Sequence, residues 1–208
     1  MKRLTDKSTL PFALLARLNA EDYLRGIFEA GFFGHEKIFE SELFDTQGPV
    51  LDCGCGNGIF AGLFSPEDYT GIDISLDSVR YAKLQFPDHF FQVMDARAMA
   101  FDDGVFKRCF VAGVFHHLGP RESQQILSEI SRVLSHDGVL VVWEDIPARH
   151  PLNFPGHAAH SLDRGRYIRP AHAYRQDIHQ YFRIDKEYNI RSGFMDYAVF
   201  RCSKGPSQ

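Results

Sequence analysis

The residues best suited to chemistry form a glycine-rich run, residues 52–58, with the sequence DCGCGNG. It follows a short apolar segment and precedes a segment with a helical pattern. Three alternate glycines let the backbone turn sharply and approach a ligand, because no Cβ stands in the way. Such a loop between a strand and a helix is typical of nucleotide-binding α/β proteins. Taken alone, it is equally consistent with a simple strand-to-helix turn.

Two carboxylates follow this loop at the ends of the next two apolar segments. Asp73 lies 19 residues after Gly54, the spacing at which an acidic residue reaches the ribose of a bound nucleotide. Asp95 follows one strand further on, where an adenine ring would lie. Residues 56–61 (GNGIFA) also fit the pattern of a nicotinamide dinucleotide site. Asp52 argues against that ligand, because a carboxylate on the strand disfavours a pyrophosphate and favours a cation.

Strand-like and helix-like segments alternate along most of the chain. The predicted strands are 50–53, 69–74, 89–94, 106–114 and 139–143. The predicted helices are 10–30, 34–44, 58–64, 76–86 with Ser75 as its N-cap, 120–135 and 170–182. Two alternating segments, 184–191 and 195–202, predict a terminal antiparallel hairpin. Continuously apolar strands separated by helices indicate an α/β fold with a parallel sheet covered on both faces, which binds ligands at the carboxyl ends of its strands.

The length of 208 residues suits one domain, predicted over 1–208, with an N-terminal helical cap over 1–47. Residues 147–169, rich in Pro, Gly and His, are expected to form a lid or substrate loop. The net charge of −4 argues against DNA as a partner, and no stretch approaches the ~20 apolar residues of a membrane span. We expect a cytoplasmic monomer or homodimer with reduced cysteines. We expect no metal site, because His157 and His160 lack further ligands.

Five segments together resemble the class I S-adenosylmethionine-dependent methyltransferases, in particular the small-molecule, methyltransferase-11-like group. In order, they are 50–58, 69–75, 93–96, 110–118 and 133–140, and the resemblance covers roughly residues 48–145. It implies a Rossmann-like, seven-stranded, mostly parallel sheet with a C-terminal antiparallel hairpin and helices on both faces. It also implies that S-adenosylmethionine, which carries a sulfonium and an ammonium group, is the cofactor.

The resemblance implies a role for the residues at the strand ends. The glycines would contact the methionine part of the cofactor, with Asp52 near its ammonium group. Asp73 would bind the ribose hydroxyls, Ile74 and Met94 would sandwich the adenine, and Asp95 would accept from the adenine amino group. The full predicted cofactor-binding set is Asp52, Gly54, Cys55, Gly56, Asn57, Gly58, Asp73, Ile74, Met94, Asp95, Ala96, Val114, His117 and Phe33.

The candidate catalytic residues are His116, His117 and Glu144, at the ends of the fourth and fifth predicted strands. A histidine titrates near neutrality, so either could deprotonate an acceptor. The alternative is that one of them bonds to backbone and lines the cofactor without chemistry. Glu144 or its neighbour Asp145 could hold the acceptor, or the two could form a solvated acidic turn.

The turn after the fourth predicted strand has the sequence Phe115-His116-His117. It lacks the Pro-Pro-aromatic motif of enzymes that methylate base amino groups and the Pro-Cys of cytosine-carbon enzymes. We therefore expect a methyltransferase that acts on an O, N or C atom of a small-molecule acceptor. The alternatives are a module that binds S-adenosylmethionine without turnover and, third, an NAD-dependent oxidoreductase.

Overall fold

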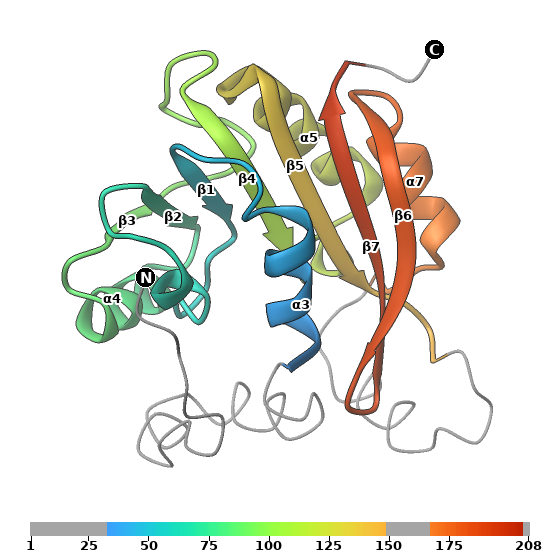
Figure 1. Cartoon of the computed structure of the whole chain (residues 1–208), viewed down its shortest axis with the longest axis horizontal. Coiled ribbons are helices and arrows are strands. Elements are labelled where there is room, and N and C mark those ends of the chain that lie inside the picture. The colour runs from blue at the N-terminus through green and yellow to red at the C-terminus, as the bar shows by residue number, and fades with distance from the viewer. Residues whose placement is uncertain (1–32, 149–166, 206–208) are drawn as a thin grey trace.

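The computed structural model describes residues 33–148 and 167–205, and these contain one seven-stranded sheet in the order β3-β2-β1-β4-β5-β7-β6. Strands β1 to β5 pair in parallel, whereas β7 is antiparallel to both β5 and β6 (Figure 1). The predicted fold class is therefore confirmed. The strands are β1 (Val50–Cys53), β2 (Tyr69–Asp73), β3 (Phe90–Val93), β4 (Phe106–Ala112), β5 (Leu134–Asp145), β6 (Phe182–Ser192) and β7 (Met195–Lys204).

Helices cover both faces of the sheet, with α3 on one face and α5 on the other (Figure 1). Four of the predicted helices are confirmed with shifted ends, and Ser75 caps α4 by accepting from the Ser78 amide at 3.2 Å. The helix predicted over 10–30 lies outside the described residues. The helices are α3 (Phe33–Glu42), α4 (Leu76–Gln85), α5 (Pro120–Val133) and α7 (Ala171–Ile178), and the 3₁₀ turns are η2 (Ala61–Leu63) and η3 (Phe115–His117).

The helix predicted over 58–64 is wrong. The backbone there makes tight turns instead, from the Gly58 amide to Cys55 O at 2.9 Å and from the Ala61 amide to Gly58 O at 3.0 Å. Gly58 has φ +75°, a left-handed conformation that interrupts a right-handed helix before it can begin. The segment therefore stays a loop with one 3₁₀ turn.

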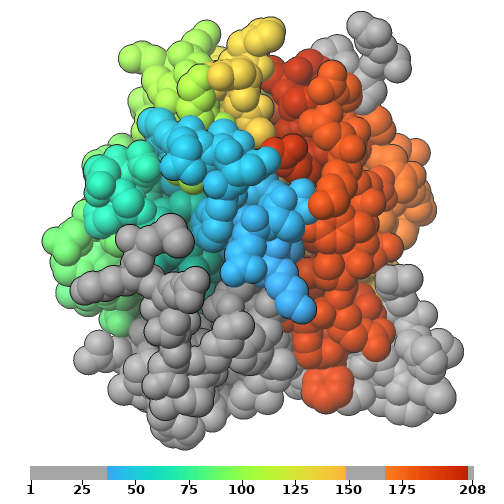
Figure 2. Space-filling model, in the orientation of Figure 1, coloured from blue at the N-terminus to red at the C-terminus, as the bar shows by residue number. Residues whose placement is uncertain are grey.

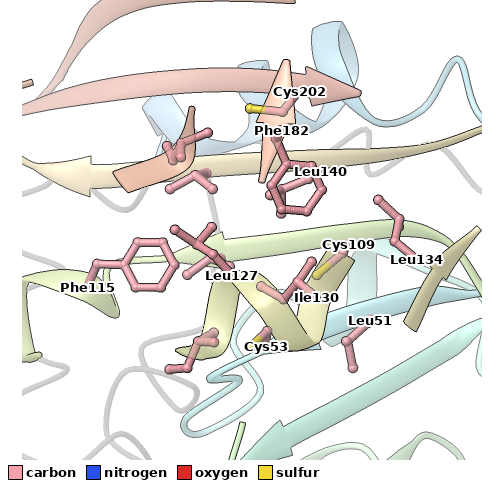
Figure 3. Close-up of a cluster of buried hydrophobic side chains, with 14 of the residues drawn as sticks. Leu51, Cys53, Cys109, Phe115, Leu127, Ile130, Leu134, Leu140, Phe182 and Cys202 are labelled. Atoms are coloured by element: carbon pink, nitrogen blue, oxygen red, sulfur yellow. The ribbon is translucent and has the colours of Figure 1, made fainter. Parts of the chain in front are cut away.

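The alternation of residues along each strand sends side chains into two cores. Leu51 and Cys53 of β1 face α5 and pack against its Leu127 and Ile130 (Figure 3). On the other face, Phe39 of α3 packs edge-on against strand aromatics, with ring centroids 5.1 Å from those of Phe110 and of Trp143. The burial of these large apolar side chains fixes the sheet between its helix layers. All four cysteines are buried and free: Cys53, Cys55, Cys109 and Cys202.

Strand β5 is longer than predicted, since it begins at Leu134 rather than near residue 139. Residues 137–138, which precede the predicted strand 139–143, lie within β5 at an irregularity in its pairing with β4. At its other end β5 reaches Asp145 and carries two acidic residues to the carboxyl edge of the sheet. The strand order reverses between β1 and β4, so the crevice at that edge is where ligands bind in folds of this kind.

Candidate functional site

The glycine loop leaves β1 at the reversal of strand order. The Gly54 and Cys55 amides both donate to Ile72 O, at 2.8 and 2.9 Å. A Cβ at Gly54 (φ +83°) would lie 2.5 Å from Cγ2 of Val114, so this position accepts only glycine. Gly56 is different: its φ is +50°, but a Cβ there would meet no heavy atom of residues 33–148 and 167–205 within 4 Å. The loop is therefore anchored at one end, and at Gly56 the described residues leave space beside it.

Asp73 stands beside that open space. Its Oδ2 accepts from the Gly56 amide at 2.9 Å and its Oδ1 from the Ser75 amide at 2.8 Å. These two bonds fix the carboxylate against the loop, and the residue remains partly exposed. Since each carboxylate oxygen can accept two hydrogen bonds, both oxygens keep capacity for a ligand's hydroxyl groups.

Asp52 lies inside the protein rather than on the crevice surface. It is 1% exposed, and its Oδ2 accepts from the hydroxyl of Tyr69 at 2.6 Å. Burial raises the pKa of Asp52 to about 8, the Asp73 charge adds to the rise, and the Tyr69 hydrogen bond opposes it. Tyr69 is a partner that the sequence analysis missed. Contact between Asp52 and a cationic ligand stays a prediction.

The residues predicted to bind an adenine come together at the ends of β2 and β3. Ile74 is 67% exposed, whereas Met94 is 8% exposed and packs partly into the core. The Asp95 carboxylate accepts from the Arg97 guanidinium at 2.7 and 3.0 Å, and this pairing lowers its pKa. Arg97 was not predicted, although a cation two residues after the motif was a visible signal. Ala96 lies between the members of this pair and is half-buried.

Glu144 holds the turn that follows β4. Its Oε1 accepts from the amides of Val114 and Phe115, both at 2.8 Å, and its Oε2 accepts from the His116 amide at 3.2 Å. The Nδ1 of His116 lies 3.0 Å from the same Oε2. Glu144 and Asp145 are both fully buried, so the solvated acidic turn considered from the sequence is wrong. The backbone of the turn, rather than solvent, surrounds the Glu144 carboxylate.

The two adjacent histidines differ in exposure. His116 is fully buried, whereas His117 is exposed, and their ring centroids are 4.0 Å apart. The Tyr167 amide donates to His116 O at 2.9 Å, which brings the described end of the predicted lid, residues 167–169, next to this turn. Of the two, His117 is therefore the histidine that a ligand in the crevice could reach.

The part of the chain that the structure describes does not assign a ligand-binding role to the remaining predicted residues. Cys55 is 7% exposed, and burial raises the pKa of its thiol well above the usual range, so its side chain is a packing group. Asn57 is half-buried within the loop. Phe33 begins α3, but its side chain lies outside the described residues, as do His157 and His160. The residues that the structure describes bring together no three His, Cys, Asp or Glu side chains suited to a metal ion.

A separate groove of about 560 Å³ lies between α3 and β6 and does not include the glycine loop. Figure 2 shows these two segments side by side, α3 in blue and β6 in orange. The groove is bordered by Glu42, a buried carboxylate that accepts from Lys186 Nζ at 2.5 Å and from the Tyr188 hydroxyl at 3.0 Å. This cluster joins α3 to the hairpin.

Within residues 33–148 and 167–205, no helix is both long enough and apolar enough to cross a membrane.

Comparison with known proteins finds a family model and relatives that resemble part of this chain. Residues 51–142 match the family model described as a methyltransferase domain. The putative 23S rRNA (guanine-N(1)-)-methyltransferase YxjB of Bacillus subtilis (strain 168) is 29% identical over 180 residues, 70% of this chain and 61% of the relative. The tRNA (carboxymethyluridine(34)-5-O)-methyltransferase alkbh8 of Xenopus tropicalis is 32% identical over 97 residues, 45% of this chain and 15% of the relative. The matches thus span less than two thirds of either relative's length.

Solved structures share the fold. The PH0226 protein from Pyrococcus horikoshii OT3 superposes with a TM-score of 0.69 at 19% identity, over 88% of this chain and 92% of that one. Geranyl diphosphate C-methyltransferase from Streptomyces coelicolor A3(2), solved with S-adenosyl-L-homocysteine, superposes with a TM-score of 0.66 at 14% identity, over 83% and 76%. At these identities the similarity establishes the Rossmann-like architecture.

Proposed function

We propose that the protein is a class I S-adenosylmethionine-dependent methyltransferase, which binds S-adenosylmethionine at its glycine loop and transfers the methyl group to an acceptor. The match of residues 51–142 to the model of a methyltransferase domain supports this proposal. The observation that carries this proposal is the space at Gly56 that the described residues leave unfilled, next to a carboxylate fixed by two backbone amides. A cofactor with ribose hydroxyls and a methionine tail fits that arrangement, since it needs close backbone approach and hydroxyl acceptors.

Each group at the crevice has a proposed part in binding. Asp73 accepts from the ribose hydroxyls with its remaining lone pairs. The exposed Ile74 supplies an apolar surface for the adenine ring, and Asp95, oriented by Arg97, accepts from the adenine amino group. The Gly56 backbone lies against the methionine part.

The proposed chemistry is an in-line displacement at a methyl group that the bound cofactor supplies. The protein then contributes alignment and exclusion of water, and alignment alone supplies about 7–11 kcal/mol of the barrier. For a hydroxyl acceptor a base is also needed, and His117 is the proposed base because it is exposed at the crevice. His116 and Glu144 are buried and are not proposed to touch the acceptor.

We propose a small molecule as the acceptor, methylated at an O, N or C atom. The Phe115-His116-His117 turn supports this class, because it lacks the motifs of base-amino and cytosine-carbon methylation. A base in RNA is the second candidate, and it is favoured by the names of the two relatives, an rRNA and a tRNA methyltransferase.

The test begins with calorimetric titration of the purified chain with S-adenosylmethionine, S-adenosylhomocysteine and NAD. We expect the two adenosyl ligands to bind with micromolar Kd, about −8 kcal/mol, and NAD not to bind. Binding of NAD alone, or of no ligand, would overturn the proposal.

The acceptor is then sought with methyl-tritiated S-adenosylmethionine, using total RNA and a small-molecule extract as separate substrates. Asp73→Ala serves as the control variant, which is expected to bind the cofactor more weakly by one to two decades. Label in the small-molecule fraction alone supports the first candidate, and label in RNA supports the second. Binding without label in either fraction would identify a module that holds the cofactor without turnover.

A further inference from the structure

Glu144 is a carboxylate with an unusual set of partners for a residue at the end of an apolar strand. It is fully buried, and its two oxygens accept from three consecutive backbone amides, those of residues 114–116, and face Nδ1 of His116. Burial of a charged carboxylate is costly unless hydrogen bonds replace its hydration. Here four donors do so, at distances between 2.8 and 3.2 Å.

The side chain of Val114 connects the turn that Glu144 holds to the glycine loop. The Val114 amide is held by Glu144, and the Val114 side chain fills the space that a Cβ on Gly54 would need, 2.5 Å away. The Gly113 amide also donates to Trp143 O at 3.0 Å, so the turn is fixed to β5 on both sides of Val114. The position of the glycine loop therefore depends on the conformation of the turn, because Val114 packs against Gly54.

A second set of contacts runs to the exposed histidine. Nδ1–H of His116 donates to the Glu144 carboxylate, which fixes the tautomer and the ring orientation. The Asp145 Oδ2 atom lies 3.4 Å from the same nitrogen. The His116 ring in turn packs against His117, with centroids 4.0 Å apart. Glu144 orients the His116 ring, and the His116 ring in turn restricts the position of the His117 ring.

We infer that Glu144 is a positioning residue of the proposed methyltransferase site: it builds the 114–117 turn so that Val114 fixes the glycine loop and His117 faces the acceptor. This inference rests on the proposed function. Glu144 acts through other groups and contacts neither cofactor nor acceptor.

The test uses Glu144→Gln, which keeps the side-chain volume but replaces one acceptor oxygen with an NH₂ group. At least one backbone amide then loses its acceptor. In the folded variant we expect S-adenosylhomocysteine to bind at least tenfold more weakly by calorimetry. We also expect the His117 ring to titrate at lower pH by NMR, because a buried negative charge has been removed. Glu144→Asp keeps the carboxylate and is expected to recover part of both properties.

The matched control is Glu129→Gln. Glu129 on α5 likewise accepts from a backbone amide, that of Met99 at 2.7 Å, and pairs with Arg132. This control is expected to lower the free energy of unfolding without changing S-adenosylhomocysteine affinity. Equal affinity of folded Glu144→Gln and the wild type, with an unchanged His117 titration, would overturn the inference.

Two further results separate the inference from the proposed function. A wild type that does not bind S-adenosylhomocysteine refutes the proposed function, and the His117 titration then still tests the link between Glu144 and the turn. If Glu144→Gln does not fold, Val114→Ala replaces it, since it removes the side chain against Gly54 and keeps every Glu144 bond. Weaker binding by folded Val114→Ala supports the inference, and unchanged binding overturns it.

Discussion

Alanine at position 56 is expected to separate ligand binding from folding. Gly56 has φ +50°, so alanine there adopts a left-handed conformation that costs about 1–2 kcal/mol. The added methyl group meets no atom of the described residues within 4 Å, and the amide can still donate to Asp73. The variant is therefore expected to fold, with its free energy of unfolding lowered by the conformational cost alone.

The same methyl group projects into the space where the cofactor is proposed to lie. Forcing an extra methyl into a packed contact costs about 1–3 kcal/mol. At 1.4 kcal/mol for each factor of ten, Gly56→Ala is expected to weaken S-adenosylhomocysteine binding by about 5- to 150-fold. The N–H groups of the loop are unchanged, so the loss comes from steric exclusion.

Gly104→Ala is the matched control. Gly104 has φ +70°, and a Cβ there would come no closer than 3.7 Å to a heavy atom, the Cα of Ser135. It lies before β4, at the edge of the sheet opposite the crevice, so it carries the same conformational cost without the ligand. The assay is urea denaturation followed by calorimetric titration of both variants. Equal affinity of folded Gly56→Ala and Gly104→Ala for S-adenosylhomocysteine would refute the placement of the ligand.

Three further perturbations test neighbouring contacts. Asp73→Ala is expected to weaken S-adenosylhomocysteine binding by one to two decades, since a hydrogen bond to a charged group contributes about 1.5–3 kcal/mol; an unchanged Kd would exclude Asp73 from the site. Burial raises the pKa of Asp52 from 3.8 to about 8. Between these pH values the folded chain keeps a proton that the unfolded chain releases, so this carboxyl lowers the free energy of unfolding as pH rises. Asp52→Asn should flatten that fall in urea titrations from pH 5 to 8, and a slope equal to that of the wild type would contradict the assignment. Glu42→Gln is expected to lower the free energy of unfolding by about 1.5–3 kcal/mol, because its buried carboxylate accepts from Lys186 and Tyr188; wild-type stability in urea would show that these bonds contribute nothing.

Much of the fold could be predicted because its information is local. Mostly apolar runs define β1 and β4, helical periodicity defines α5, and an N-cap serine marks the start of α4. The seven-stranded sheet was expected from the resemblance to a family, and its strand order was not predicted, since periodicity does not say which strands pair. The error over 58–64 has a local cause. The prediction followed the helical pattern of the apolar residues and did not take account of the left-handed conformation of Gly58.

The site was predictable where fixed spacing along the chain determines it. Gly56 follows β1 and Asp73 ends β2, and these two strands pair directly, so the contact between the two residues is determined by the loop motif and the end of the next strand. The partners of Glu144 were not predictable in this way, because they lie about 30 residues earlier and meet it only through the register of β4 with β5. A usable signal was present: an acidic residue that ends the apolar run of β5 must find buried donors, and the turn after β4 offers them.

The carboxylates at the ends of three strands differ in what surrounds them, and this difference assigns their roles. Asp52 has a phenol partner inside the core and a pKa raised to about 8, which suits a structural acid. Glu144 has four donors and no exposure, so all its capacity is directed to the turn. Asp73 has two amide donors and partial exposure, so it alone of the three keeps acceptor capacity toward the crevice. Replacing Asp73 should therefore change ligand affinity directly, whereas replacing Glu144 should change it only through the turn, and part of that loss should return with Glu144→Asp.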